Sequence, residues 1–457
     1  MTHLSTFMDK MRQAHLPQVV LETFAHYYDQ VISGATGMVS DDQIRPVDGT
    51  EIADAASLDS YIPAGRDVLG HTAQIVLNGG LGTSMGLTGP KSLLQVKDNK
   101  TFLQIIIEQA ASAGVSLAFM NSFTTDAQTR AAVQALAPQP SPRFFLQHKF
   151  PKILRDDFSP ARWPQNPELE WNPPGHGEIY TALGTSGLLS DFLSQGLRYA
   201  LIVNCDNLGA TLDPALLGYF SKHGFPFMME VAQRTPTDMK GGHLARHANG
   251  RLMLREIAQC PESDLAAFQD IERFRYFNVN SLWIDLQALF ELVRDNRVIH
   301  LPMILNPKTL DPRDAQSPAV YQVETAMGAA ISLFEGATAV AVPDTRFQPV
   351  KKCADLLARR SDCFTFHTNG TLVPNPVRRL GRIQIRLDPA FYTLIDDFEQ
   401  RFANGVPSLI ACEALTIEGD VYFERDVVIR GRVRIHNSGP TPAVIPAGTV
   451  IEKNLTV

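Results

Sequence analysis

Short apolar runs alternate with helical patterns through the middle of the chain, and this alternation constrains the fold more than any other feature. The runs at residues 73–77, 115–120 and 199–203 are strand-like, because each ends at polar or glycine-rich residues. Helices are predicted at 101–113, with a capping box and a glycine stop, and at about 125–136. This order of elements predicts βαβ units and an α/β fold.

The rest of the chain divides by composition. At 457 residues it exceeds one ordinary core, so two or three domains of roughly 150 residues are expected. Residues 1–70 contain helical patches and are predicted to form an N-terminal helical segment, and residues 71–375 a central α/β domain. Within that domain the proline-rich stretch 138–177 is predicted to be a structured excursion or an active-site loop region. A strand-rich stretch follows at 225–284, with helical patterns at 286–295 and 323–335.

Apolar residues recur every six positions near the C-terminus. One series is Leu409, Leu415, Val421, Val427 and Val433, and a second, two places later, is Ala411, Ile417, Phe423, Ile429 and Ile435. A six-residue period is typical of a parallel β-helix, whereas an ordinary meander with accidental spacing is the alternative. We therefore expect a small C-terminal β-helix domain over residues 376–457, better suited to packing or oligomerisation than to chemistry.

Charge and cysteine content exclude several classes of protein. The 41 basic and 48 acidic residues give a formal net charge of -7, and no cluster of Lys and Arg suggests a nucleic-acid partner. No apolar run approaches the roughly 18 residues of a membrane span, and the first residues lack the apolar stretch of a signal peptide. Five widely spaced cysteines without a C-x-x-C motif suggest neither a disulfide framework nor a zinc site. We expect a cytoplasmic protein without a membrane partner.

A glycine-rich segment, LNGGLGTSMGLTGPKS at 77–92, follows the first apolar run. It fails the dinucleotide fingerprint because Met85 stands where the third glycine is needed, and it fails the Walker A motif because Pro90 precedes Lys91. What remains is a strand, a loop whose glycines permit close backbone approach, and a lysine as a compact positive charge for a phosphate. A glycine turn with a solvated lysine is the alternative, but the position after a buried strand favours a nucleotide loop.

Further blocks of the sequence follow this loop in order. They are MNSFTTDAQT, QHKFPKI, WNPPGHGEIY, VNCDNLGATLD, MKGGHLAR, LREIAQCP, FNVNSLWIDL, VETAMGAAISLFEG and RFQPVKK. Together with the glycine loop they resemble the eukaryotic-type UTP–glucose-1-phosphate uridylyltransferase (UDP-glucose pyrophosphorylase) family over about residues 75–355. The resemblance implies a Rossmann-like, GT-A-like nucleotidyltransferase fold with a mixed sheet and a left-handed parallel β-helix at the C-terminus.

The same resemblance implies a Mg²⁺-dependent reaction in which glucose 1-phosphate attacks the α-phosphorus of UTP, giving UDP-glucose and pyrophosphate. Because the attacking phosphate is already an anion at pH 7, no general base is required. Catalysis should come from positioning two polyanions and neutralising charge on the transferring group. Small-molecule substrates are therefore the expected partners, and any homo-oligomer contact is expected at the β-helix.

The resemblance assigns one set of positions to UTP. They are Leu77, Asn78, Gly79, Gly80, Lys91, Gln147, Gly175 and Lys351. Lys91 and Lys351 match the catalytic lysines, and Gln147 matches the residue that reads uracil, whose donor and acceptor edge an amide can pair. A surface lysine and a strand-end amide are the alternatives. The choice of Lys351 over Lys352 rests on counting from Pro349.

A second set of positions is assigned to the sugar phosphate and the metal. The sugar phosphate set is Gly79, Gly80, His176, Asn204, Gly242, Asn278, Asn280 and Glu324. Asp206 is the expected Mg²⁺ ligand, at the end of an apolar strand, where open α/β sheets bind ligands. One carboxylate is enough for Mg²⁺ when phosphates and waters complete its shell. His243, Val279 and Ser281 depart from the residues expected in the family, which leaves the sugar specificity open.

Three other functions compete with this one. A broad-specificity UDP-sugar or UDP-N-acetylhexosamine pyrophosphorylase is expected to carry a loop nearer L-A-G-G-Q-G-T-R-L-G, whereas Leu81 and the SMG ending favour the glucose enzyme. A non-catalytic nucleotide-sugar sensor or assembly protein should have lost Lys91, Asp206 or Lys351, and none is lost. A nicotinamide oxidoreductase is disfavoured by the failed fingerprint.

Overall fold

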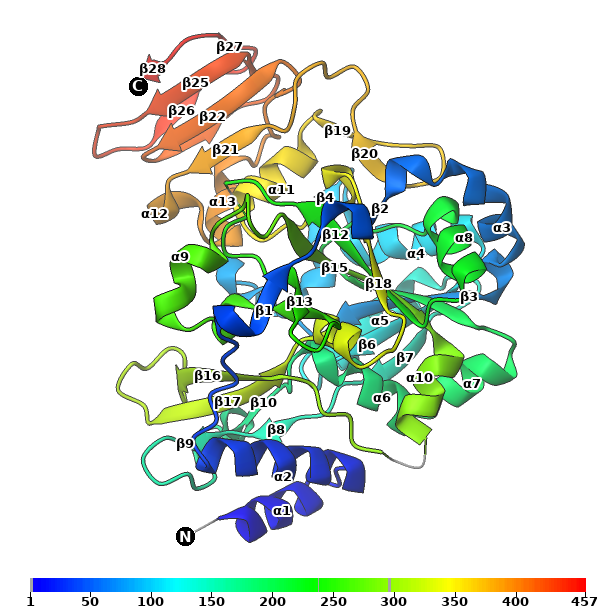
Figure 1. Cartoon of the computed structure of the whole chain (residues 1–457). Coiled ribbons are helices and arrows are strands. Elements are labelled where there is room, and N and C mark those ends of the chain that lie inside the picture. Colours follow the sequence, from blue (N-terminus) through cyan, green and yellow to red (C-terminus); the bar gives the residue numbers. More distant parts are fainter. Residues whose placement is uncertain (1–2, 237, 295–296) are drawn as a thin grey trace.

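The computed structural model describes residues 3–236, 238–294 and 297–457. Its centre is an 11-stranded sheet whose main path runs β2-β18-β12-β15-β11-β3-β6-β7 (Figure 1). These strands are β2 (Ala53–Asp54), β3 (Thr72–Asn78), β6 (Ser116–Asn121), β7 (Arg143–Leu146), β11 (Tyr199–Asn204), β12 (Phe227–Gln233), β15 (Tyr276–Asp285) and β18 (Thr338–Ala341). Neighbours along this path are parallel except for β15, which is antiparallel to β11 and β12. The predicted mixed α/β sheet is confirmed.

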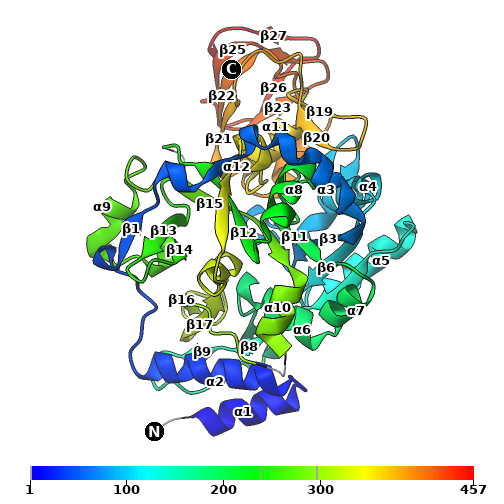
Figure 2. The ribbon, with the colours of Figure 1, turned by 45° about the vertical axis from the view of Figure 1, so that its right-hand side comes forward.

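Helices cover both faces of this sheet (Figure 2). Side chains alternate along β3, so that Val76 packs with α4 and α8 in one apolar cluster while Ile75 packs with α6, α7 and α10 in another. These helices are α4 (Phe102–Ala113), α6 (Ile179–Thr185), α7 (Leu188–Ser194), α8 (Pro214–His223) and α10 (Leu286–Val293), with α5 (Asp126–Leu136) beyond β6. Thr101 and Gln104 form the predicted capping box of α4, and Gly114 ends it in the left-handed region. The three-layer arrangement leaves the carboxyl ends of the parallel strands for a ligand site.

The first 70 residues contribute strands as well as helices. Their helices are α1 (Leu4–Gln13), α2 (Gln18–Ile32) and α3 (Ile62–Asp67), which account for the predicted helical patches. However, β1 (Ile44–Pro46) pairs with β13 (His243–His247), and β2 pairs with β18, so this segment adds two strands to the central sheet. Strands of two or three residues are too short to show an alternating pattern in the sequence.

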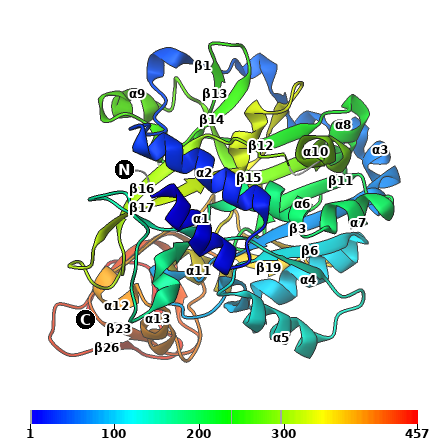
Figure 3. The same ribbon diagram turned by 90° about the horizontal axis from the view of Figure 1, so that it is seen from below.

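The proline-rich stretch 138–177 is structured, which agrees with the first of the two predictions made for it. It holds β8 (Phe150–Pro151), β9 (Ile153–Leu154) and β10 (Trp171–Asn172), and β9 joins a small sheet with β16 (Met303–Thr309) and β17 (Ala319–Thr325). Helices α1 and α2 pack against it through an apolar cluster that contains Phe24, Phe150 and Val323. Figure 3 views the molecule from this side, where α1 and α2 cross in front of the sheets.

The helix predicted at 323–335 is wrong. Residues 319–325 form β17, and residues 327–332 form a 3-10 segment rather than an α-helix. Gly328 in that segment lies against Leu254 and Asn278, where a Cβ atom would come within 2.8 Å of both side chains. Tertiary packing therefore outweighs the helical pattern. The helix predicted at 286–295 is confirmed as α10, which ends at Val293.

The C-terminal strands pair only in parallel. They are β21 (Gln384–Leu387), β22 (Cys412–Glu418), β23 (Val421–Phe423), β24 (Val428–Ile429), β25 (Gly431–His436), β26 (Ala443–Ile445), β27 (Val450–Ile451) and β28 (Leu455–Thr456). The residues of both six-residue series are buried except Ala411, which is exposed while Cys412 is buried. A register shift between Cys412 and Ala414 explains that exception. The buried residues of these strands continue the apolar cluster that contains Val76 of the central sheet.

The remaining elements connect these parts. They are β4 (Gln95–Lys97), β5 (Lys100–Thr101), β14 (Leu252–Arg255), α9 (Leu265–Phe268), α11 (Cys353–Arg360), β19 (Phe364–Phe366), β20 (Leu372–Pro374), α12 (Pro389–Tyr392) and α13 (Ile395–Arg401). β14 pairs with β13, which in turn meets β15, so this hairpin extends the central sheet. Among the helices described, none is long and apolar enough to cross a membrane.

Candidate active site

The glycine loop turns sharply after β3 and returns to it. Gly82 and Gly86 take φ angles of 67° and 73°, in the left-handed region where glycine is favoured. The loop closes where Lys91 N donates to Gly80 O at 3.1 Å, and a short 3-10 turn starts at Lys91. Lys91 is only 8% exposed. The loop thus holds its lysine inside the site, and the alternative of a glycine turn with a solvated lysine does not fit this placement.

Two lysines meet one carboxylate at the carboxyl end of β11. Lys91 Nζ lies 2.6 Å and Lys351 Nζ 3.0 Å from the same oxygen, Oδ2 of Asp206. The other oxygen, Oδ1, is buried and has no hydrogen-bond partner among the described residues. Burial alone would raise the pKa of Asp206, but the two ammonium groups outweigh it and lower that pKa below its usual value. We call Lys91, Asp206 and Lys351 the phosphate end of the site.

The segment that carries Lys351 is fastened beside this strand end by backbone hydrogen bonds. Val350 N donates to Asp206 O at 3.1 Å, and Gln348 N donates to Asn207 Oδ1 at 2.9 Å. The Lys351 side chain is nevertheless 57% exposed, in contrast to the buried Lys91. The backbone is therefore fixed while the ammonium group can still move.

Lys352 has a different environment from Lys351. It occupies the N-cap position of α11, and the backbone N–H groups of both lysines donate to Asp355 Oδ2 at 2.9 Å. Only Lys351 forms an ion pair with Asp206 among the contacts of these two residues in the described structure. The geometry supports the choice made by counting from Pro349.

The residues predicted to hold uridine lie beside the start of the glycine loop. Gln147 Nε2 donates to Gly175 O at 2.6 Å, and a Cβ atom on Gly79 would lie 3.1 Å from Gln147 Oε1. Gly175 has a φ of 79° and lies directly against the backbone of Thr325, so a larger residue does not fit there. Gln147, Gly79 and Gly175 are therefore brought together, as predicted.

Asn78 and Leu77 differ from the others in where their side chains lie. Asn78 is fully buried, and its Nδ2 donates to Asn121 Oδ1 at 2.8 Å and to Thr129 Oγ1 at 2.9 Å. Leu77 is 8% exposed and belongs to the apolar cluster of α6 and α7. The side chains of these two residues pack within the fold, so the residues contribute backbone groups to the loop region.

His176 is held as a neutral ring at pH 7. Met327 N donates to its Nδ1 at 2.9 Å, so the ring proton lies on Nε2. Burial, together with the positive charge of Lys351, lowers the pKa of His176 to about 4. The ring can therefore donate one N–H without carrying a charge. Asn204, the last residue of β11, lies half-buried two residues before Asp206.

Three of the residues predicted for the sugar phosphate, Gly242, Asn278 and Asn280, lie together, and Glu256 lies beside them. Asn278 N donates to Gly242 O at 2.9 Å, and Asn278 Nδ2 donates to Asn280 Oδ1 at 2.8 Å. Asn280 has a φ of 56°, in the left-handed region, which asparagine adopts more readily than most residues with a side chain. A Cβ atom on Gly242 would lie 2.5 Å from Glu256 Oε2. We call Gly242, Glu256, Asn278 and Asn280 the sugar end, after the role that the family resemblance predicts for three of them.

Sequence reasoning missed Glu256. Glu256 is half-buried, and this burial raises the pKa of its carboxyl group. The available signal was a carboxylate directly after the apolar strand β14, in the block LREIAQCP. Glu324, which was predicted, lies instead on β17 with its Cβ 3.1 Å from the Cβ position of Gly175. Burial also raises the pKa of Glu324, although a hydrogen bond with Asn306 acts in the opposite direction.

The three departures from the family pattern have side chains in the interior. His243 is fully buried, with its ring 3.9 Å from that of Phe274, and Ser281 is fully buried within β15. Val279 belongs to the apolar core. Burial and the nearby charges of Arg234 and Arg255 lower the pKa of His243 to about 3. These substitutions therefore alter packing behind the sugar end.

Covalent chemistry has no support in this site. The thiol nearest to it belongs to Cys205, beside Asp206, and burial raises its pKa to about 12. The described residues also contain no group of three or more His, Cys, Asp or Glu side chains that could hold a metal by themselves. The site offers fixed cations, backbone donors, one buried carboxylate and a neutral imidazole.

Comparison with known proteins supplies the remaining observation. The family model for UTP–glucose-1-phosphate uridylyltransferase matches residues 21–430. The chain belongs to this family. The uridylyltransferases of Hordeum vulgare and Saccharomyces cerevisiae are 38% and 37% identical to it over 400 and 408 residues. Each match covers 86% of this chain, with 82% and 79% of the relatives.

Solved structures from the same family have the same fold. A mutant of the UDP-glucose pyrophosphorylase from Leishmania major in complex with UDP-glucose is 40% identical, with a TM-score of 0.91 and full coverage of both chains. A UDP-glucose phosphorylase from Trypanosoma brucei is 39% identical, with a TM-score of 0.87, over 100% of this chain and 99% of that one. The likeness covers the whole chain and therefore includes the C-terminal strands, which follow the last of the sequence blocks.

Proposed function

We propose that the chain transfers the uridylyl group of UTP to glucose 1-phosphate and releases UDP-glucose and pyrophosphate. The observation that carries this proposal is the convergence of Lys91 and Lys351 on Asp206, at the end of the glycine loop. Family membership and the UDP-glucose complex of the Leishmania major relative support it. The substrates are small molecules.

The reaction needs no proton transfer. A phosphate oxygen of glucose 1-phosphate attacks the α-phosphorus of UTP, and the bond from that phosphorus to the oxygen bridging to the β-phosphate breaks. Pyrophosphate leaves with the electron pair. Lys91 and Lys351 neutralise charge on the transferring and leaving phosphates, and they are released from Asp206 to do so. His176 donates its Nε2–H to the sugar phosphate, together with Asn204.

The remaining residues position the two substrates. On the nucleotide side, Gln147 pairs with uracil, and the backbone of the loop approaches the nucleotide closely. This set comprises Leu77, Asn78, Gly79, Gly80, Lys91, Gln147, Gly175 and Lys351. On the sugar side, Gly242, Asn278 and Asn280 contact hydroxyl groups, and Glu256 joins them because its carboxyl group faces Gly242. Glu324 supports the nucleotide loop through Gly175.

Asp206 fits a Mg²⁺ ligand. Its Oδ1 is buried without a hydrogen-bond partner among the described residues, while Oδ2 faces the lysines. One carboxylate suits Mg²⁺ when substrate phosphates and waters complete six oxygen ligands. When bound, the ion would neutralise phosphate charge and orient the triphosphate. We expect EDTA to abolish turnover and Mg²⁺ to restore it, and turnover that persists in EDTA would contradict this assignment.

Pyrophosphate release tests the function itself. The measurement uses UTP with glucose 1-phosphate, galactose 1-phosphate or N-acetylglucosamine 1-phosphate in parallel, and each of the other nucleoside triphosphates with glucose 1-phosphate. The fastest release is expected with UTP and glucose 1-phosphate. No release with any sugar, or a preference for another nucleotide, would overturn the proposal, and equal rates with all three sugars would point to the broad-specificity alternative.

We extend the proposal to the organisation of the chain. Its elements divide into three parts: an N-terminal segment (1–70), a central catalytic domain (71–375) and a C-terminal left-handed parallel β-helix (376–457). Leu415 pairs with Val433, 18 residues later, which equals three six-residue units. Hydrogen–deuterium exchange would test these boundaries, because a separate domain should exchange as its own cooperative unit.

The end of the C-terminal strands is our candidate contact between copies of the chain. Val444 and Val450 are exposed on β26 and β27, and Val457 is exposed directly after β28; each of these strands lacks a neighbour on one side in the described structure. Sedimentation analysis of the wild type and of Val450→Lys would test this, since only the wild type should associate.

All five cysteines are buried and unpaired, which supports a reducing compartment such as the cytoplasm.

A further inference from the structure

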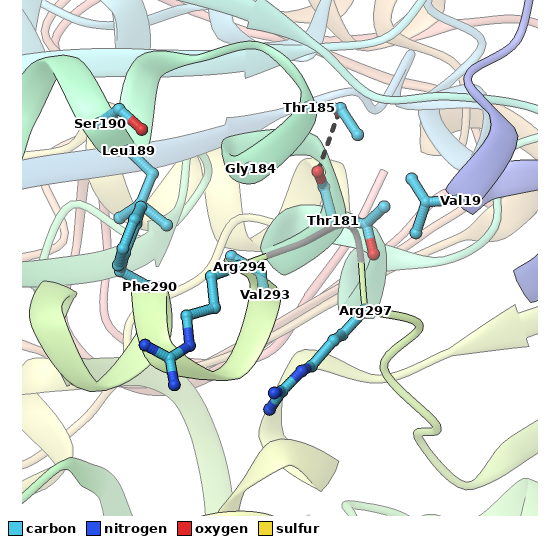
Figure 4. A pocket seen from close by; sticks show the side chains of 10 residues that line it. All are labelled: Val19, Thr181, Gly184, Thr185, Leu189, Ser190, Phe290, Val293, Arg294 and Arg297. Carbon is cyan, nitrogen blue, oxygen red and sulfur yellow. Dashed lines mark hydrogen bonds between the residues drawn. The ribbon is translucent and has the colours of Figure 1, made fainter.

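A cavity of about 240 Å³ is lined mainly by residues of α2, α6, α7 and α10 (Figure 4). None of the residues assigned above to UTP, the sugar phosphate or Mg²⁺ is among them. A buried polar side chain without an assigned role does lie beside the phosphate end of the site. It belongs to Asn207, which directly follows Asp206 and is 5% exposed. Its contacts point to a part in the reaction.

The backbone that carries Lys351 has no regular secondary structure over residues 347–351. No strand or helix ladder fixes it, so its backbone groups need partners from elsewhere. On one side the helix α11 supplies them. Asp355 accepts from Lys351 N at 2.9 Å. Arg359 Nη2 donates to Gln348 O at 3.3 Å. These bonds join the segment to the helix that follows it and leave its attachment to β11 to other groups.

The side-chain amide of Asn207 joins this segment to the end of β11. Its Nδ2 donates to Arg346 O at 3.0 Å. Its Oδ1 accepts from Gln348 N at 2.9 Å. The amide therefore pairs with the backbone on both sides of Phe347, much as a neighbouring strand would.

Asn207 supplies most of this attachment. In the described structure, one other hydrogen bond connects Asp206 or Asn207 with the backbone of the segment, from Val350 N to Asp206 O at 3.1 Å. Because Asn207 follows Asp206 directly, its amide links the backbone before Lys351 to the carboxylate with which Lys351 forms an ion pair. The relative position of these two charged groups thus depends on Asn207.

The two residues paired or enclosed by this amide are themselves fixed to the sheet. The guanidinium group of Arg346 forms two hydrogen bonds of 2.7 Å with the carboxylate of Glu230, which is fully buried on β12. The ring of Phe347 packs edge to face against that of Phe277 on β15, with centroids 5.2 Å apart. Asn207 therefore meets a segment whose start has a set position.

We propose that Asn207 is a positioning residue, which places Lys351 at the reacting phosphates by holding the backbone that precedes it. The Lys351 side chain is 57% exposed, so the backbone rather than side-chain packing sets the reach of its ammonium group. A misplacement of about 1 Å can lower a rate by about 10²-fold. Asn207 touches no reacting atom in this role, because its amide is engaged by Arg346 and Gln348. The inference rests on the proposed uridylyltransferase function.

Steady-state kinetics of a double-variant cycle test this role. Asn207→Ala should lower kcat by about 10- to 100-fold with little change in the KM for UTP, since a displaced Lys351 affects the transition state more than binding. In the Lys351→Ala background the same substitution should lower kcat by less than about twofold, because no lysine is left to position. An unchanged kcat in Asn207→Ala, or an equal loss in both backgrounds, would overturn the proposal.

Asn207→Ser is the second variant, in case the alanine variant does not fold. Its hydroxyl group can satisfy one of the two backbone groups that the amide leaves free. The same cycle should then show a smaller loss of kcat in the wild-type background and again little loss in the Lys351→Ala background. Equal losses in the two backgrounds would contradict the proposal here as well.

Asn437→Ala is the matched control. Asn437 lies directly after β25, is 7% exposed and also bonds to backbone through its side-chain amide. Its Nδ2 donates to Asp420 O and Thr441 O. Its Oδ1 accepts from Gly439 N. The control loses hydrogen bonds of the same kind away from the site, so its kcat should stay within about twofold of the wild type. A kcat loss equal to that of Asn207→Ala would show a general effect on the fold.

Hydrogen–deuterium exchange decides on the attachment without any turnover. A peptide covering residues 346–352 should exchange about three- to tenfold faster in Asn207→Ala than in the wild type, the effect of losing one hydrogen bond. The same peptide should be unchanged in Asn437→Ala. Unchanged exchange in Asn207→Ala would overturn the inference. A wild type that releases no pyrophosphate would instead contradict the proposed function, and the exchange result does not depend on that release.

Discussion

The phosphate end and the sugar end of the site differ in the chemical groups that they contain. At the phosphate end, the charged side chains of Lys91 and Lys351 come from distant segments and meet on one carboxylate. At the sugar end, Asn278 and Gly242 are joined by a backbone hydrogen bond, Asn280 is in the left-handed region, and Glu256 lies against Gly242. Charge tolerates variation in distance, whereas hydroxyl groups require donors and acceptors at set positions. An exposed side chain such as that of Lys351 is therefore tolerated at one end, whereas rigid backbone is needed at the other.

Lys351→Ala gives the largest expected effect of this comparison. Removing one charge from the transferring phosphate should lower kcat by about 10²- to 10³-fold, the usual range for loss of one transition-state donor. The KM for UTP should change much less, because Lys91 remains. Steady-state kinetics of Lys352→Ala provide the control, and a kcat loss there equal to that of Lys351→Ala would move the role to the neighbouring residue.

Gly242→Ala should act at the sugar end with a smaller effect. The new Cβ would lie 2.5 Å from Glu256 Oε2, so the carboxyl group must shift. We expect kcat/KM for glucose 1-phosphate to fall by about 10- to 100-fold, consistent with misplaced substrate. The KM for UTP should stay close to its wild-type value. Gly381→Ala, where no atom lies within 4 Å of the new Cβ, is the matched control. An equal loss of kcat/KM for both substrates would show that the two ends of the site do not act separately.

The pH dependence of stability tests the packing behind the sugar end. The pKa of His243 is lowered to about 3, so below pH 6.5 the unfolded chain takes up a proton that the folded chain does not. Stability from this residue is complete above pH 6.5 and falls as the pH decreases. The expected loss is about 1 kcal/mol for each pH unit between pH 6 and pH 4.

Urea unfolding of the wild type and of His243→Leu at pH 7, 6, 5 and 4 measures this loss. The variant should show a shallower fall in the free energy of unfolding, because it lacks the titrating ring. His367→Leu changes an exposed histidine and should follow the wild type. Parallel curves for wild type and His243→Leu would show that the ring is protonated in the folded chain.

Glu256→Gln should have the smallest effect. The amide keeps the shape of the side chain and can still hydrogen-bond, but it exchanges an acceptor for a donor. We expect the KM for glucose 1-phosphate to rise by about three- to tenfold, the usual effect of one hydrogen bond, with kcat nearly unchanged. A fall in kcat with unchanged KM would place this carboxyl group at the reacting phosphates instead.

The sequence predicted the regular parts of this chain because local pattern and tertiary packing agree there. The strand at 73–77, the capped helix that ends at Gly114 and the six-residue series all depend on periodic burial, which neighbouring residues display directly. The helix expected at 323–335 failed because Gly328 packs closely against Asn278. The strands β1 and β2 could not be predicted, since two or three residues acquire strand geometry only from a partner strand.

The sequence by itself determined which chemistry the chain carries. The glycine loop with Lys91 and the blocks that follow it, among them those that carry Asp206 and Lys351, together resemble one family. Only the tertiary structure decided which groups act together, because the distances between Lys91, Asp206 and Lys351 are set by strand ends that meet across the sheet. It also brought Glu256 close to Gly242 and Thr185 close to His148, and no pattern in the sequence predicts either contact.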